Sequence, residues 1–214
     1  MGKLEINKKL KQNSLYQAAF DLFTNKGFAK TTISDIVKKA ELTKGTFYLY
    51  FEDKYELRDK LIARKAGQLF LDAYEDLIEH PVSGFENQIL RMIDYIVEYL
   101  RKNHMLLQFI SKNLSWGILK NAFEKTVPDE TQQFYEYYLE LMKKSSVVCR
   151  QPELMLFTIV ELTGATCYSC ILHNQPVSME EYLPYLHRSV HEIIRSFTES
   201  DQDVLIQTDT GKDA

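Results

Sequence analysis

The residues best suited to contact another molecule lie between Thr43 and Lys54. Within about three helical turns this segment combines hydroxyl groups, two lysines and two tyrosines. Hydroxyl and ammonium groups donate hydrogen bonds to phosphate oxygens, and an ammonium group also reaches the O6 and N7 acceptors of guanine. These residue types therefore indicate contact with the backbone and the base edges of double-stranded DNA.

A helix that starts after Thr43 sorts the segment into two faces. At 100° per residue, Phe47 and Phe51 share the face that turns toward a core. Gly45 and Leu49 then point directly away, where glycine lets the backbone approach the bases and leucine can lie on a thymine methyl group. From this face and its flanks we expect DNA contacts by Thr32, Thr43, Lys44, Gly45, Thr46, Tyr48, Leu49, Tyr50 and Lys54.

Two short helices joined by a turn must position this segment. Thr32 followed by Asp35 is a capping box, which starts a helix of about two turns. Residues 41–43 interrupt the apolar period, and Thr43 is placed to cap the next helix. A longer helix precedes both and ends near Gly27, which can adopt the left-handed conformation that closes a helix. This order predicts a helix-turn-helix, although two short helices at a corner of an all-α core would show the same pattern.

The rest of the sequence predicts an all-α protein. Apolar residues recur at helical spacing almost throughout, and eight Gly and five Pro among 214 residues are too few for the turns of an all-β fold. We expect about eight to ten helices and no sheet. The predicted domains are a three-helix helix-turn-helix domain (1–51), a larger C-terminal helical ligand-binding and dimerisation domain (52–198), and a flexible polar tail (199–214), with a helix over about residues 52–79 linking the first two.

Three further signals mark helix starts in the second domain. Ser83 with Glu86 and Ser178 with Glu181 have the spacing of capping boxes. Pro152 suits the first turn of a helix, where its missing N–H is not needed. We therefore expect one helix from Pro152 onward and others over about residues 83–102, 106–114, 116–125, 126–142 and 178–197.

Charge divides the chain into two parts. The net charge of −4, taken alone, argues against a nucleic-acid partner. Residues 1–65, however, contain 14 Lys and Arg against eight Asp and Glu, whereas the other 149 residues contain 12 basic and 22 acidic side chains. A basic N-terminal third on an acidic body suits a module that meets phosphates, although uneven charge also occurs in proteins that bind no polyanion.

The N-terminal segment carries a specific set of motifs, TTISDIV at residues 31–37, LTKGTFYLYF at residues 42–51 and DKYEL at residues 53–57. In this combination it resembles the N-terminal signature of the TetR family of bacterial transcriptional regulators over about residues 10–60. The resemblance implies an all-helical homodimer with an N-terminal DNA-binding domain and a C-terminal regulatory domain. It further implies a repressor that binds a pseudo-palindromic DNA operator and is released by a small-molecule effector. Three Cys do not make a disulfide framework, and no apolar stretch follows the basic N-terminus as in a signal peptide, so we expect a cytoplasmic location.

The same resemblance suggests a role for each matching residue. Thr43, Lys44 and Gly45 would start the recognition helix. Tyr48 and Lys54 would hold backbone phosphates, whereas Leu49 and Tyr50 would face the bases or the groove. Leu49 departs from the family, whose members often carry His or Tyr there, so the operator sequence does not follow from the resemblance.

Aromatic and methionine side chains of the central helices are the candidates for a ligand cavity, which the resemblance places in this part of the chain. Such walls suit an apolar or aromatic ligand, and the acidic excess favours a cationic one through attraction to ring faces. The same side chains would serve equally well as plain core. The candidates are Met92, Tyr95, Tyr99, Phe109, Trp116, Phe134 and Tyr138.

Two apolar stripes near the C-terminus are candidates for a dimer interface. They recur at helical spacing, and the first includes small residues that allow helices to approach closely. Stripes packed inside one subunit would look the same. The residues are Phe157, Val160, Gly164, Cys167 and Ile171 on the helix after Pro152, and Leu186, Val190 and Ile193 on the last helix.

Other classes of function have weaker support. A helical enzyme or a redox or metal sensor would use Cys167, Cys170 and His173. These residues lack the flanking context of a redox motif. We therefore expect no cofactor and no metal. Residues 154–172 are apolar enough to approach a membrane span, but Glu161 near the centre favours a buried or dimer-forming helix. A helical module whose basic third meets an acidic protein or a membrane surface stays open.

Overall fold

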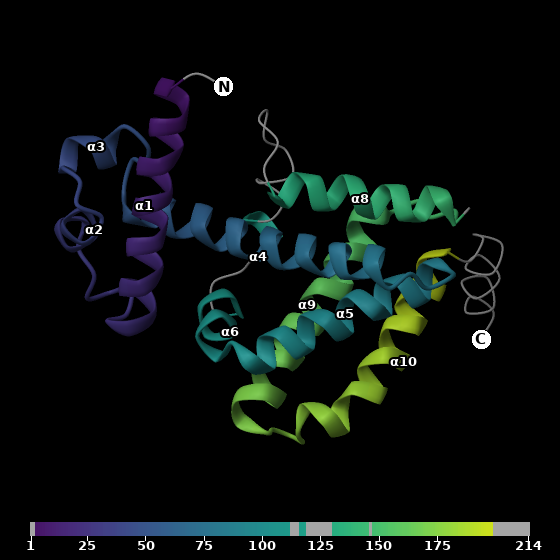
Figure 1. Cartoon of the computed structure of the whole chain (residues 1–214). Helices are drawn as coiled ribbons and strands as arrows, with labels where there is room; N and C mark the ends of the chain where they lie inside the picture. The colour runs from purple at the N-terminus through teal and green to yellow at the C-terminus, as the bar shows by residue number, and fades with distance from the viewer. Residues whose placement is uncertain (1–2, 112–115, 119–129, 146, 199–214) are drawn as a thin grey trace, which may run out of the picture. The chain divides into compact units, whose positions relative to one another are not determined.

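The computed structural model describes residues 3–111, 116–118, 130–145 and 147–198. Within these ranges the chain is helical and contains no strand, so the prediction of an all-α fold is confirmed (Figure 1). The helices are α1 (Lys3–Asn25), α2 (Ile33–Lys39), α3 (Lys44–Tyr48), α4 (Lys54–Glu79), α5 (Phe85–Lys102), α6 (His104–Ser111), α8 (Glu130–Lys144), α9 (Pro152–His173) and α10 (Met179–Thr198).

Most helix ends lie where the local signals predict them. Gly27 follows α1 with φ +86°, in the left-handed region that glycine adopts without steric cost. Thr32 caps α2, and Thr43 caps α3 by accepting a hydrogen bond from the Thr46 N–H. Ser178 Oγ accepts a hydrogen bond from the Glu181 N–H at 3.2 Å and so caps α10. Pro152 occupies the first turn of α9 as expected.

The predicted capping box at Ser83 is wrong. Helix α5 begins at Phe85 and is preceded by Gly84, whose φ of +86° makes this glycine the residue that turns the chain into the helix. Glu86 does not reach back to Ser83, because its carboxylate accepts a hydrogen bond from His191 on α10. The expected fragment at residues 116–125 is helical at residues 116–118, and its other residues lie outside the described ranges.

The chain divides into two compact units. The N-terminal unit comprises residues 1–71 and 102–133, and the C-terminal unit comprises residues 72–101 and 134–214. Helix α4 contributes residues to both units, and α6 belongs to the N-terminal one. The boundary of the compact units therefore differs from the sequence-based boundary at residue 51, because packing of α4 and α6 extends the N-terminal unit beyond its first three helices.

The N-terminal unit is built around α1. The helix-turn-helix packs on the apolar face of α1 through buried side chains, and α6 packs on α1 through Phe109. The Phe109 ring meets Phe20 edge to face with the centroids 5.4 Å apart, and it stacks on Phe23 at 6.4 Å. Buried residues at the centre of the unit are Leu15, Ala18, Ala19, Ile36, Val37, Phe47, Phe51, Leu57 and Leu61.

The C-terminal unit contains α5, α8 and the long antiparallel pair of α9 and α10 (Figure 1). Tyr138 of α8 is buried, and its hydroxyl donates to the Pro152 carbonyl at 3.0 Å. His187 and His191 of α10 each meet a carboxylate of α5, with Nε2 of His187 lying 2.6 Å from Asp94. Helix α9 is long and apolar enough by composition to cross a membrane, and one third of its most apolar window is buried.

Candidate nucleic-acid interface

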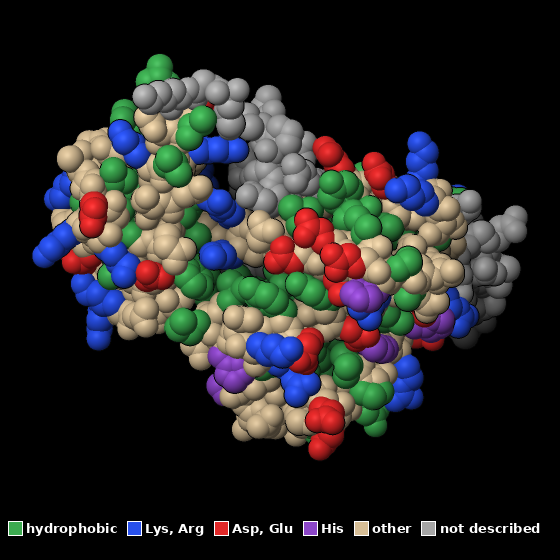
Figure 2. Space-filling model, viewed as in Figure 1, with side chains coloured by type: hydrophobic (Ala, Val, Ile, Leu, Met, Phe, Trp, Pro, Cys, Tyr) green, Lys and Arg blue, Asp and Glu red, His purple; other side chains and the backbone are tan. Residues whose placement is uncertain are grey.

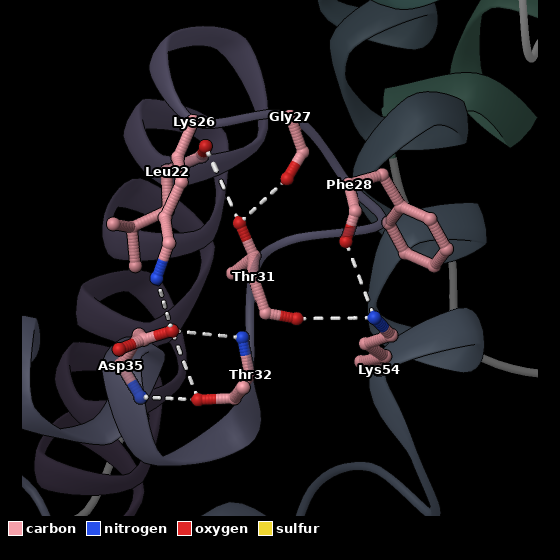
Figure 3. Close-up of polar contacts among 8 residues, drawn as sticks. All are labelled: Leu22, Lys26, Gly27, Phe28, Thr31, Thr32, Asp35 and Lys54. Atoms are coloured by element: carbon pink, nitrogen blue, oxygen red, sulfur yellow. Dashed lines mark hydrogen bonds and ion pairs between the residues drawn. The ribbon is translucent and has the colours of Figure 1, made fainter.

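A network of short hydrogen bonds fixes the start of α2 (Figure 3). The Asp35 N–H donates to Thr32 Oγ1 at 3.1 Å, and the Asp35 carboxylate accepts from the Thr32 N–H at 2.9 Å, which completes the predicted capping box. The same carboxylate accepts from the Lys26 ammonium group at 2.7 Å. The lysine and the two Thr32 donors lower the pKa of Asp35 to about 2. This site therefore stays ionised and holds α2 against the end of α1.

Buried Thr31 joins the loop before α2 to the end of α1. Its hydroxyl donates to the Gly27 carbonyl at 2.8 Å, and the Leu22 carbonyl lies at 3.4 Å from the same oxygen (Figure 3). A buried hydroxyl without partners would cost stability, and these carbonyls remove that cost. Sequence analysis assigned no role to Thr31, although the paired threonines TT before ISD were visible in the motif.

Lys54 at the start of α4 is bound within the protein. Its ammonium group donates to the carbonyls of Thr31 at 3.0 Å and Phe28 at 3.2 Å, and it lies 4.6 Å from the centre of the Phe28 ring (Figure 3). An ammonium group has three N–H donors, so two carbonyls leave one for a further acceptor. Lys54 thus ties the loop before α2 to α4, and its predicted contact with a DNA phosphate must use the remaining donor.

Helix α3 is held between a capped start and a buried aromatic pair. Thr43 accepts from the Thr46 N–H at 3.1 Å, and the two hydroxyls lie 3.0 Å apart. Phe47 is completely buried and Phe51 nearly so, with ring centroids 5.6 Å apart. The predicted inward face of α3 is therefore confirmed, and burial of these rings sets the rotation of the helix.

The opposite face of α3 is open to solvent. Leu49 is 78% exposed and Tyr48 is 57% exposed. Lys44, Gly45 and the Thr43 cap are also exposed, whereas Thr46 and Tyr50 are half-buried at the flanks. Thr32 is exposed at the start of α2. The structure thus brings the predicted DNA-contact residues onto and around one outward surface.

Gly45 is not required for folding by space or by backbone conformation. A Cβ atom added there would meet only Thr43 Oγ1, at an ordinary contact distance of 3.8 Å. Its φ does not fall in the left-handed region. Glycine in a helix is less favourable than alanine by about 1 kcal/mol, so Gly45 does not stabilise the isolated chain. The missing side chain instead leaves the backbone of α3 open to a partner.

The backbone N–H groups in the first turn of α4 are already occupied. The Asp53 carboxylate accepts from the N–H groups of both Tyr55 and Glu56 at 2.8 Å. A side chain that caps a helix takes the donors which an anion would otherwise use. An Asp directly before a helix was a signal present in the sequence, and it argues against an anion site at this helix start.

Basic side chains surround the helix-turn-helix. On the face drawn in Figure 2, Lys and Arg side chains spread over α1, α2 and α3, and acidic groups are fewer there. Two of the carboxylates present are in ion pairs, Asp35 with Lys26 at 2.7 Å and Asp21 with Lys39 at 3.2 Å. The positive charge of the first 65 residues is therefore carried by the same part of the molecule that presents α3.

Comparison with known proteins agrees with this geometry. Residues 15–61 match the bacterial regulatory proteins of the tetR family. Residues 15–61 therefore form a TetR-family helix-turn-helix domain. The match covers α2, α3 and the start of α4, the segment whose outward face was predicted to contact DNA.

Relatives and a solved structure extend the likeness beyond this domain. The chain is 22% identical over 170 residues to the helix-turn-helix transcriptional regulator YhgD of Bacillus subtilis, covering 78% of this chain and 87% of that protein. It is 25% identical over 154 residues to the dhaKLM operon transcriptional activator DhaS of Lactococcus lactis, covering 69% and 76%. A TetR-family regulator from Syntrophomonas wolfei shares the fold with a TM-score of 0.62 at 20% identity, covering 87% of this chain and 95% of that one. The N-terminal match and these relatives together support a TetR-family transcriptional regulator.

The candidate ligand residues are distributed over both compact units. Phe109 and Trp116 belong to the N-terminal unit, and Phe109 is packed on α1. In the C-terminal unit Met92, Phe134 and Tyr138 are buried, and burial raises the pKa of the Tyr138 hydroxyl well above its usual value. Tyr95 and Tyr99 lie next to each other on α5 with their rings stacked 6.3 Å apart. None of these seven residues lines either of the two cavities that are described, one between α1 and α4 and one beside the start of α5.

Three of the eight predicted dimer-interface residues are enclosed within the single chain. Cys167, Leu186 and Val190 have no exposed surface in the single chain, so they are core residues that join α9 to α10. A partner subunit cannot contact atoms that are already enclosed. The remaining candidates, Phe157, Val160, Gly164, Ile171 and Ile193, are partly exposed and stay available for an interface.

The cysteines of α9 are poorly placed for redox chemistry. Burial raises the pKa of the Cys167 thiol to about 12 and also raises the pKa of Cys170, so neither forms a thiolate readily. All three cysteines are free thiols. The described residues include no group of three or more His, Cys, Asp or Glu side chains that could hold a metal ion.

Proposed function

We propose that this regulator is a homodimeric repressor that binds a pseudo-palindromic operator with α3 in the major groove. The observation that carries the proposal is the division of α3 between a buried Phe47 face and an exposed face of Lys44, Gly45 and Leu49. An exposed leucine on a short, rigidly capped helix is suited to contact thymine methyl groups, and a lysine beside it suits guanine. Repression, rather than activation, follows the commonest mode of the family, and the relative DhaS is named an activator.

Positioning on the DNA backbone is assigned to the residues around α3. Tyr48 and Tyr50 carry hydroxyl groups beside the outward face, and Thr32 lies at the start of α2. The remaining donor of the Lys54 ammonium group would hold a phosphate while its other donors fix the loop before α2. These contacts set the register of α3 without carrying sequence information.

Dimerisation would use the exposed part of α9 and α10. Helix α9 is strongly apolar in composition, yet only one third of its most apolar window is buried within the chain. Leu154 is 48% exposed on α9 and Tyr185 is 58% exposed on α10. An apolar face of this kind is stable in water only when another surface covers it, and a second copy brings the recognition helices to about 34 to 36 Å apart.

A small apolar or aromatic ligand in the C-terminal unit is proposed to control the regulator. A ligand shifts DNA binding only by as much as its affinities for the two conformations differ. Helix α4 supplies residues to both units and is the continuous element through which such a shift would pass. A cytoplasmic location is part of the same proposal.

Selection of bound sequences from random duplex DNA tests the DNA-binding part of the proposal. A two-fold-symmetric motif with half-sites about ten base pairs apart is expected. Heparin binding without enrichment of any DNA sequence would instead identify a basic interaction module. A reporter gene placed behind the selected motif then separates repression from activation.

A further inference from the structure

A second feature of the N-terminal unit lies away from the recognition surface. Helices α1 and α4 enclose a cavity of about 500 Å³, a volume within the usual range for small-ligand sites. One side comes from α1 and the other from residues of α4 that share a single helix face (Figure 1). Its lining includes Leu10, Asn13, Gln17, Leu61, Arg64 and Lys65, and none of the lining residues that the structure describes is acidic.

The cavity combines two cationic groups with amide groups. The Arg64 guanidinium group donates to the Asn13 side-chain oxygen at 2.7 Å and lies 5.1 Å from the centre of the Tyr16 ring. This contact orients the guanidinium plane across the space between the two helices. A guanidinium group presents five N–H donors in a planar fork, and that geometry matches a carboxylate or a phosphate.

Lys65, the residue after Arg64, is half-buried and forms no ion pair with a carboxylate of the described residues. Its ammonium group lies 4.6 Å from the centre of the Phe20 ring, and the structure gives it no hydrogen-bond acceptor or ion pair among the described residues. Asp21 is the acidic residue that acts electrostatically on Lys65. Its two carboxylate oxygens, however, already contact Lys39 at 3.2 Å and Gln17 at 3.0 Å. Burial and the neighbouring Arg64 lower the pKa of Lys65. A bound anion would relieve this unfavourable environment.

We propose that the cavity between α1 and α4 binds a small organic anion, with a carboxylate group held by Arg64 and Lys65 and an apolar body lying against Leu10 and the Tyr16 ring. The amides of Gln17 and Gln68 and the hydroxyl of Ser14 lie around the same space and supply further polar contacts. Figure 2 shows Lys and Arg side chains at the edge of a hollow on this side of the N-terminal unit. The site lies wholly within one unit and does not depend on the proposed operator or ligand.

The test uses benzoate as the probe, titrated into the full-length protein without DNA in a calorimeter. Wild-type protein is expected to bind benzoate with one site per chain. Lys65→Gln and Arg64→Gln should each weaken binding about tenfold or more, because each removes a hydrogen bond to a charged group. Lys38→Gln is the matched control, since it removes the same charge from an exposed position on α2 outside the cavity and should leave benzoate binding unchanged.

Two further measurements keep the test decisive. Gln68→Glu places a negative charge on the exposed rim of the cavity without emptying any core, so it should weaken benzoate binding even if Lys65→Gln lowers the melting temperature. Benzyl alcohol has the same ring without the charge and should not bind. The proposal is overturned if wild-type protein does not bind benzoate, if binding survives both cavity substitutions, or if benzyl alcohol binds as tightly as benzoate.

Discussion

The two units of this protein differ in what determines their structure. In the N-terminal unit, hydrogen bonds between residues three apart start α2 and α3, as the Thr32–Asp35 and Thr43–Thr46 contacts show. In the C-terminal unit, the informative contacts join distant segments, such as Tyr138 with Pro152 and His187 with Asp94. Short-range contacts are visible as sequence motifs and long-range contacts are not. The proposed DNA-binding surface is therefore defined residue by residue, whereas the proposed ligand site is not.

The largest expected effect comes from emptying the core beneath α3. Phe47→Ala should destabilise the protein by about 3 to 5 kcal/mol, because it leaves a cavity at a completely enclosed position. Leu186→Ala, at an equally buried position of the C-terminal unit, should cost about 2 to 5 kcal/mol. Denaturant unfolding followed by circular dichroism measures both. A cost below about 1 kcal/mol for Phe47→Ala would contradict its place in the core.

A smaller effect separates base contacts from backbone contacts within the recognition surface. Leu49→Ala should lose about 1 to 3 kcal/mol on the selected operator and little on random DNA, because its side chain is exposed and supports no core. Lys54→Ala should weaken binding to both DNAs and flatten the dependence on salt. It should also lower the melting temperature, since Lys54 bonds two carbonyls. Equal losses on specific and random DNA for both variants would reject the assigned roles.

Helix caps allow the two units to be compared directly. Thr43→Ala and Ser178→Ala each remove one hydroxyl that accepts a hydrogen bond from the residue three positions later. Each should cost about 1 kcal/mol of stability. Only Thr43→Ala should also weaken operator binding, because the start of α3 then becomes less ordered. Binding measured by fluorescence anisotropy at several salt concentrations checks this, and an equal loss for Ser178→Ala would break the distinction between the units.

The smallest expected effect concerns the pH dependence of the α2 cap. Asp35 has a pKa lowered to about 2 from the ordinary value of 3.8, so its contribution to stability is complete above pH 3.8 and is lost as the pH falls toward 2. Wild type should be more stable than Asp35→Asn at pH 5, and the difference should shrink between pH 4 and 2. Thermal melts of both proteins across this range measure it. A difference that is independent of pH would show that the carboxylate charge does not matter.

Structural features that depend on neighbouring residues could be predicted from the sequence. The order of the helices, the caps at Thr32, Thr43 and Ser178, and the inward turn of Phe47 all follow from local spacing, and the structure confirms them. The family was also visible in the motifs of residues 31–57. The prediction at Ser83 is wrong because the adjacent Gly84 turns the chain instead, so the same spacing has a different structural outcome.

Other features depend on which helix packs against which, and the sequence does not contain that information locally. Cys167, Leu186 and Val190 share the apolar spacing of an interface, yet they pack within one chain. Phe109 was predicted as a ligand residue from its sequence position, and its ring packs on Phe20 of α1, a contact that the sequence does not show. The two carbonyl partners of Lys54 lie 23 and 26 residues earlier in the chain, so its structural role could not be inferred from the motif.

The central claim is that the outward face of α3 lies against DNA bases, and Gly45→Ala tests it most directly. The structure leaves ordinary space for the added methyl group, so the variant should melt no lower than wild type. Its affinity for the selected operator should fall by about tenfold or more, since the methyl group separates the backbone from the bases, while its affinity for random DNA should be nearly unchanged. A stable Gly45→Ala protein that binds the operator as tightly as wild type would contradict the account.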